Sequence, residues 1–126
     1  MFARQREKLS VYTPKPGSKE RKAILDALRK PVVQSMNQVV DFHNVTLKVK
    51  NGWAYVTAIG KDANGKPLKK FDGQYFPFQA LLRKQGKSWQ VMSWGAGGGT
   101  DATDTARKKY PQAPREVFPP TGGDGA

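Results

Sequence analysis

Apolar positions follow two different periods along this chain, helical near the N-terminus and alternating through the middle. In "KERKAILDALRK", which follows Ser18, the residues Ile24, Leu25 and Leu28 recur at the spacing that places apolar side chains on one helix face. Ser18 suits the N-cap because its hydroxyl can accept a hydrogen bond from the first turn. Pro31 either interrupts this helix or opens a second short one through "PVVQSMN". We therefore predict an amphipathic helix that begins after Ser18.

A period of two takes over in "VTLKVK" and "WAYVTAIG", which flank Asn51-Gly52, the strongest short hairpin signal. A two-residue turn sets lysines opposite aromatic residues on one face, in the pairs Lys50/Trp53 and Lys48/Tyr55. The other face is apolar, with the pairs Val49/Ala54, Leu47/Val56 and Val45/Ala58. The alternation shifts parity near His43, which predicts a β-bulge there.

A second hairpin is predicted from "YFPFQALLRK" and "SWQVMSW", joined through Gln85-Gly86-Lys87. Pro77 indicates that the third strand starts irregularly or lies at a sheet edge. Trp89 and Trp94 have opposite parity, so they can share a sheet face only if the strand contains a bulge. We expect at least one of them in the core, and an aromatic-lined cavity between sheet and helix is the functional alternative.

These elements predict an α+β fold, in which the N-terminal helix packs on a curved antiparallel sheet of about four strands. A short helix over residues 101–110 and an extended tail follow, and Val117 and Phe118 should tuck this tail onto the body. We divide the chain into a basic flexible arm (1–17), a single α+β domain (18–119) and a disordered tail (120–126).

Charge is the property that says most about partners. The chain has 22 basic and 10 acidic residues and a net charge of +12. Its first 30 residues hold nine basic and three acidic residues, whereas the last 32 are balanced at four and four. A charge this large indicates an anionic partner such as nucleic acid, a lipid head group, an envelope polymer or an acidic protein.

Three groups of residues are candidates for binding that partner. They are the lysine and aromatic face of the first hairpin (Lys48, Lys50, Trp53, Tyr55), a loop cluster (Lys66, Lys69, Lys70) and the arm (Arg4, Arg6, Lys8). On an exposed sheet face, the first group could meet phosphates by charge and bases by stacking. Ordinary cross-strand packing of lysine stems over rings and a solvated charge cluster explain the same patterns.

Catalytic and metal chemistry have few candidates. The chain lacks cysteine, which excludes disulfides and thiolate metal sites. Its single histidine is His43, which excludes any metal or catalytic site that needs two histidines. Asp41 and Asp72 are the only acids that we would test as a lone cavity carboxylate. "DANGK" at 62–66 starts like a calcium loop but lacks the later ligands, so we expect a turn. We predict neither cofactor nor metal.

The stretch "GAGGGTDATD" at 95–104 stands where a phosphate-binding loop would lie, after an apolar run and before a possible helix. It fails the dinucleotide fingerprint because Thr100 occupies the last glycine position, and no Lys-Ser or Lys-Thr completes a Walker motif. It also ends an antiparallel meander instead of a buried parallel strand. We interpret it as a hinge before a helix that Thr100 or Asp101 caps.

The segments "ERKAILDALRKPV", "NGWAYVTA", "ALLRKQGKSWQVMSWG" and "PREVFP", in this order, resemble a set of small uncharacterised bacterial proteins, many of them periplasmic. The plan is also similar to NTF2-like and cystatin-like folds. The resemblance spans about residues 18–119 and rests on packing motifs, so it implies a fold and no catalytic residues. It implies a periplasmic or exported protein if a leader has been removed upstream of Met1, and a cytoplasmic one otherwise.

From these observations we expect a non-enzymatic binding or accessory protein whose basic surface engages an anionic partner in the cell envelope. The first alternative is a cytosolic or phage-type protein that binds nucleic acid through the arm and the sheet. The second is an NTF2-like enzyme with a single cavity carboxylate. No stretch approaches the roughly 20 apolar residues of a membrane span. A dimer is possible, because a sheet edge in a small domain often pairs with a second copy.

Overall fold

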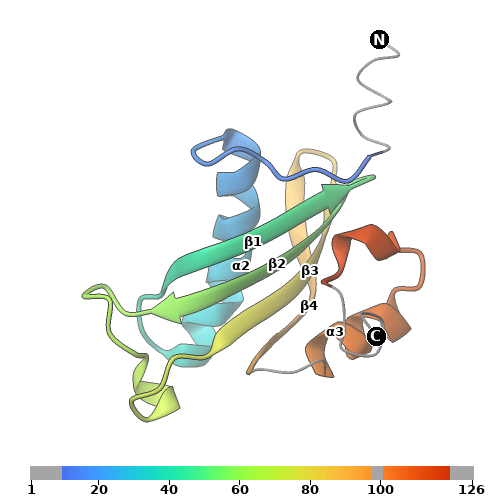
Figure 1. The fold of residues 1–126 in the computed structure, drawn as a ribbon. Helices are drawn as coiled ribbons and strands as arrows, with labels where there is room; N and C mark the ends of the chain where they lie inside the picture. The colour runs from blue at the N-terminus through green and yellow to red at the C-terminus, as the bar shows by residue number, and fades with distance from the viewer. Residues whose placement is uncertain (1–9, 98–100, 120–126) are drawn as a thin grey trace.

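The computed structural model describes residues 10–97 and 101–119 and has three layers (Figure 1). The middle layer is a four-stranded antiparallel sheet in the order β1-β2-β3-β4, formed by β1 (Asp41–Lys50), β2 (Trp53–Lys61), β3 (Pro77–Gln85) and β4 (Ser88–Ala96). One face packs against α2 (Lys19–Met36), and the other against α3 (Asp101–Lys109) and the segment that follows it. Two short 3-10 helices complete the described chain, η1 (Lys69–Phe71) and η2 (Arg115–Val117). The predicted α+β class is confirmed.

Helix α2 forms as the apolar spacing predicts, but it is longer than predicted. The Ser18 hydroxyl accepts a hydrogen bond from the Arg21 amide at 3.2 Å, and Asn37 ends the helix in the left-handed region. Its buried side chains recur every four residues: Ile24, Leu28, Val32 and Met36. The predicted interruption at Pro31 is wrong, because the helix continues through this residue. An interior proline costs about 3 kcal/mol, and burial of two further side chains at roughly 1.5–3 kcal/mol each offsets this.

The first hairpin has the predicted turn and register. Asn51 and Gly52 both take positive φ, at 53° and 76°, as a two-residue type I′ turn requires. Four of the five predicted pairs are present, Lys50/Trp53, Lys48/Tyr55, Val49/Ala54 and Leu47/Val56. The fifth, Val45/Ala58, is absent from the register because it falls where the register shifts. The register shifts between His43 and Thr46, which confirms the bulge expected at this point.

The second hairpin contains a bulge that decides which face carries its tryptophans. The β3–β4 register shifts between Leu81 and Leu82. The shift brings Trp89 and Trp94 to the same side of the sheet, where Trp89 is buried and Trp94 packs beside Phe78. Both rings therefore fill the core between the sheet and α2. The packing is tight beside Phe78, because a Cβ at Gly60 would overlap its ring.

We predicted that residues 1–17 form a flexible arm, but the residues just before α2 are packed against the rest of the protein. The Tyr12 and Val49 backbones exchange two hydrogen bonds of 2.9 and 2.8 Å, which places Tyr12 along the outer edge of β1. Pro14 is buried. The packed body therefore extends to at least residue 12, because the β1 edge offers free backbone groups that this segment satisfies. Residues 1–9 and 120–126 lie outside the described residues.

Candidate functional site

The lysine and aromatic face of the first hairpin is an internal surface in this structure. The side chains of Trp53 and Tyr55 are 5% and 2% exposed, because residues of α3 and the C-terminal segment pack over them. Val117 and Phe118 belong to this cover, as predicted. The two rings therefore cannot stack on bases unless this cover is displaced. The alternation found the face correctly, but it could not show what covers it.

A buried polar cluster attaches α3 to this face. The Tyr55 hydroxyl donates to Gln79 Oε1 at 3.0 Å, the Thr103 hydroxyl donates to the same atom at 2.9 Å, and the two hydroxyls lie 2.9 Å apart. Burial raises the pKa of the Tyr55 phenol, while its hydrogen bond with Thr103 acts in the opposite direction. The cluster is satisfied within the protein, so it is a structural feature.

The lysines of the same face lie at its margin. Lys50 donates to the Glu116 carboxylate in η2, and this hydrogen bond holds the pKa of Glu116 below its usual value. Lys48 is half-buried beside Tyr55, and the two line a small hollow together with Val117. Lys50 is therefore paired with the C-terminal segment, whereas Lys48 forms no ion pair with any residue that the structure describes.

The loop cluster is exposed and lies at the other end of the sheet. Lys70 Nζ donates to the Ser35 carbonyl in the last turn of α2 at 2.7 Å, and the Lys69 amide donates to Gln38 at 2.8 Å. Lys66 is the last residue of the "DANGK" turn. Asp62 closes this turn by accepting from two backbone amides, which is the turn that we predicted. The remaining candidates Arg4, Arg6 and Lys8 lie outside the described residues.

The residues weighed for catalysis are not brought together. Asp41, Asp72 and His43 are all exposed, and none lines a described pocket. Residues 10–97 and 101–119 contain no group of three or more potential metal ligands. Of the glycine stretch, Gly95 and Ala96 end β4 and α3 begins at Asp101, while residues 98–100 lie outside the described residues. The hinge therefore stays a prediction.

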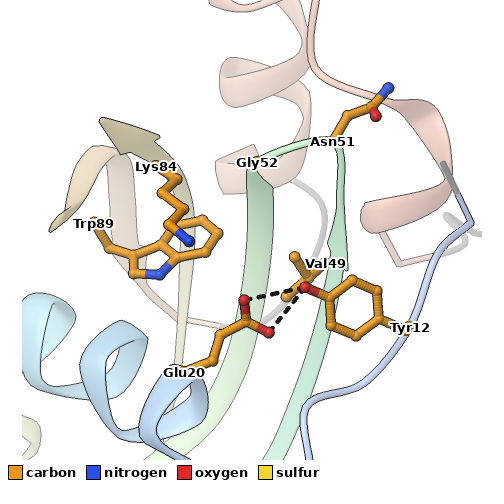
Figure 2. A pocket seen from close by; sticks show the side chains of 7 residues that line it. All are labelled: Tyr12, Glu20, Val49, Asn51, Gly52, Lys84 and Trp89. Atoms are coloured by element: carbon orange, nitrogen blue, oxygen red, sulfur yellow. Dashed lines mark hydrogen bonds between the residues drawn. The ribbon is translucent and has the colours of Figure 1, made fainter. Parts of the chain in front are cut away.

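A pocket that the sequence did not predict opens where α2 begins and both hairpins turn (Figure 2). Its volume is about 230 Å³, and it is lined by Tyr12, Glu20, Val49, Asn51, Gly52, Lys84 and Trp89. The Tyr12 hydroxyl donates to the Glu20 carboxylate, 2.9 and 3.1 Å from its two oxygens. Lys84 and Trp89 face it as a cross-strand pair of β3 and β4. The only sequence signal for this pocket was the apolar Val11-Tyr12 pair inside the predicted arm.

This end of the molecule also carries a cluster of exposed cationic residues. Figure 1 shows that the start of α2 and the β1–β2 and β3–β4 turns lie at one end. We call this the basic end and define it by five exposed cationic residues of these segments, Lys15, Lys19, Arg83, Lys84 and Lys87. Two carboxylates lie at this end, Glu20 in the first turn of α2 and Glu116 bonded to Lys50 at the end of β1, and each already has a hydrogen-bond partner. The opposite end mixes lysines with Asp41, Asp62 and Asp72, so its charges largely cancel.

A second hollow, of about 280 Å³, lies between α3 and the C-terminal segment and is lined by Arg107, Tyr110, Pro111, Ala113, Arg115 and Phe118. The Arg107 guanidinium lies 6.0 Å from the centre of the Phe118 ring. Both arginines take part in interactions within the protein, so this hollow is part of the packing of the tail.

Comparisons with protein-family models, curated proteins and solved structures find no match. Within the described residues, no helix has the length and apolar character needed to cross a membrane. The class of the protein therefore rests on its α+β architecture and on the charge and pocket at the basic end.

Proposed function

We propose that this protein is a non-enzymatic binding protein whose basic end engages a polyanionic partner in the cell envelope. The observation that carries the proposal is the clustering of Lys15, Lys19, Arg83, Lys84 and Lys87 at one end, where both neighbouring carboxylates already have hydrogen-bond partners. Because these cations come from two segments far apart in the sequence, the start of α2 with the residues before it and the β3–β4 hairpin, they present charge over a surface and not along one loop. Such a surface suits a partner with many spaced negative charges.

Charge and not base stacking is the basis of the proposed contact. Trp53 and Tyr55, which made nucleic acid an attractive partner, are buried beneath the C-terminal segment. The Arg83 guanidinium lies 5.1 Å from the centre of the Trp53 ring, so Trp53 positions this cation at the basic end through a cation–π contact. An anionic polymer or a layer of lipid head groups needs only such cations. These observations therefore favour an envelope partner over single-stranded nucleic acid.

A matched pair of charge-reduced proteins tests the proposal. The first is Lys19→Gln/Arg83→Gln/Lys87→Gln at the basic end, and the control is Lys66→Gln/Lys69→Gln/Lys70→Gln in the loop cluster. Both lower the net charge by the same amount. We expect the basic-end variant to bind phosphatidylglycerol vesicles and heparin roughly tenfold to a hundredfold more weakly, since each cation near an anionic surface contributes about 1 kcal/mol. The loop variant should change binding much less.

Two further measurements complete the test: the salt dependence of binding and the affinity for a single-stranded oligonucleotide. Affinity should fall steeply with salt, because each contact releases counterions. Equal losses in the two variants would show that net charge alone attracts the ligand and would refute the role of the basic end. Tighter binding of a single-stranded oligonucleotide than of vesicles or heparin would instead favour the nucleic-acid alternative.

A further inference from the structure

The pocket at the basic end holds two opposite charges that do not neutralise each other. Glu20 lies on the α2 side and Lys84 on the β3 side, and no ion pair joins them. Among residues 10–97 and 101–119, the ammonium of Lys84 has neither an ion pair nor a hydrogen bond. Figure 2 shows the carboxylate directed toward Tyr12, with Lys84 lying alongside Trp89 on the opposite wall. The pocket is thus negative on one side and positive on the other.

Glu20 retains capacity to accept further hydrogen bonds. A carboxylate has about four acceptor positions, whereas the single Tyr12 hydroxyl proton can occupy only one of them. Burial, followed by the hydrogen bond and the charge of Glu20, raises the pKa of Tyr12, so the phenol remains a donor at neutral pH. The remaining acceptor positions of Glu20 are available to a donor in the pocket. An ammonium group offers three N–H donors and a positive charge.

Aromatic and aliphatic groups form the rest of the wall. Trp89 is 8% exposed, Val49 is buried, and the Tyr12 ring borders the carboxylate that its hydroxyl binds. Aromatic rings beside a carboxylate favour ammonium groups, because the ring faces attract cations. A volume of about 230 Å³ is below the usual range for drug-sized ligands, roughly 300–1,000 Å³. The pocket therefore suits a molecule of only a few heavy atoms.

From this arrangement we infer that the pocket binds a small zwitterion, with its ammonium group at Glu20 beside Tyr12 and its carboxylate or phosphate at Lys84 beside Trp89. A simple anion would be repelled by Glu20, and a simple cation would be repelled by Lys84. A short chain that carries both charges meets both groups favourably. This site shares Lys84 with the proposed polyanion contact, but Glu20, Tyr12 and Trp89 belong to the pocket alone.

Small probes of defined charge test the inference directly. β-Alanine and γ-aminobutyrate carry both charges at two spacings, and phosphoethanolamine replaces the carboxylate with phosphate. Propionate and propylamine each carry one charge. We expect the Trp89 indole N–H resonance to shift saturably with at least one zwitterion, at a dissociation constant of roughly 1 mM. Each single-charge probe should bind at least about tenfold more weakly, because one of the two pocket charges then opposes it.

Variants with matched controls locate the site. Glu20→Gln and Lys84→Met keep the side-chain stems, and each should weaken zwitterion binding at least about tenfold. The controls Glu116→Gln and Lys87→Met make the same changes outside the pocket and should leave binding unaltered. Circular dichroism and Tm confirm that each variant is folded. The inference is overturned if no zwitterion shifts Trp89 saturably, if single-charge probes bind equally well, or if Glu20→Gln binds like the unchanged protein.

The same variant separates this site from the proposed function. Glu20→Gln removes a negative charge from the basic end, so it should leave vesicle binding unchanged or strengthen it while it abolishes zwitterion binding. The basic-end variant Lys19→Gln/Arg83→Gln/Lys87→Gln retains all seven lining residues, so it should still bind the zwitterion while losing vesicle binding. Loss of both activities in Glu20→Gln, with intact folding, would contradict the independence of the two sites.

Discussion

The two faces of the sheet are both buried, but they are covered in different ways. The first is covered by one 18-residue helix, and its buried contacts with the sheet are apolar, with the Arg29 guanidinium over the Phe42 ring at the margin. The second is covered by the nine-residue α3 and by η2, and it combines apolar contacts with the Tyr55–Gln79–Thr103 cluster. An ion pair between Lys50 and Glu116 lies at its margin.

This difference has a consequence for stability. Apolar contacts have no direction and add up with buried area, so the α2 layer should carry most of the folding free energy. Hydrogen bonds contribute less but specify one arrangement, so the cluster fixes where α3 docks. We therefore expect the α3 layer to be the less stable of the two.

The largest expected effect comes from truncating one buried side chain in each layer, a leucine that loses three carbons and a valine that loses two. Leu28→Ala in α2 removes a fully buried side chain and should lower the free energy of unfolding by about 2–5 kcal/mol. Val117→Ala, in the C-terminal cover, should cost roughly 1–3 kcal/mol. Denaturant unfolding measures both costs. Amide exchange should show that Val117→Ala speeds exchange in α3 and the C-terminal segment more than it speeds exchange in α2. Equal costs with uniform exchange would show that the layers unfold as one unit.

A smaller effect is expected from the polar cluster. Tyr55→Phe removes one hydroxyl and leaves Gln79 with Thr103 as a donor, so it should cost about 1–2 kcal/mol at pH 7. Tyr75→Phe is the control, because its hydroxyl bonds to the Gly65 carbonyl in an exposed loop. A Tm decrease as small as that of the control would show that the cluster does not hold α3.

The same variant has a defined dependence on pH. Burial raises the pKa of Tyr55 above its usual value of 10.0, so the unfolded chain loses this proton first as pH rises. The stabilisation is therefore complete below pH 10.0 and is lost progressively above it. Tyr55→Phe should flatten this alkaline decline, and Tyr12, whose pKa is also raised, should account for part of what remains.

The smallest effect is expected at the Lys50–Glu116 pair. Because Glu116 is exposed, its replacement by Gln should change Tm little at pH 7, and added salt should reduce even that change. Lys50 lowers the pKa of Glu116, so the stabilisation is present above the usual value of 4.5 and is lost as pH falls below it. The Tm difference between the two proteins should thus disappear in acid. A difference that persists at low pH would exclude the ion pair as its cause.

Local sequence patterns predicted most of the fold. The Asn51-Gly52 turn, the register of the first hairpin, the bulge near His43 and the short helix before Tyr110 all follow from rules that involve neighbouring residues only. Pro31 was the exception among local rules. Its penalty is local, whereas the burial of Val32 and Met36 that offsets it depends on the sheet beneath.

The candidate site was much less accessible to prediction. Lys48, Lys50, Trp53 and Tyr55 were expected to form an outward face, because alternation identifies a second face without showing what packs on it. The pocket draws Tyr12, Glu20, Lys84 and Trp89 from two segments that are more than 60 residues apart. None of them stands in a motif, so no spacing rule could bring them together.

The sequence by itself determined where the helices and strands form, which positions face the core and how strongly positive the chain is, because these depend on side-chain chemistry and short-range periodicity. Only the tertiary structure decided that the C-terminal segment covers the aromatic face and that the basic end surrounds a pocket with separated charges. Those features arise from contacts between distant segments, whose free energy depends on how the layers pack and not on the residues beside them in the chain.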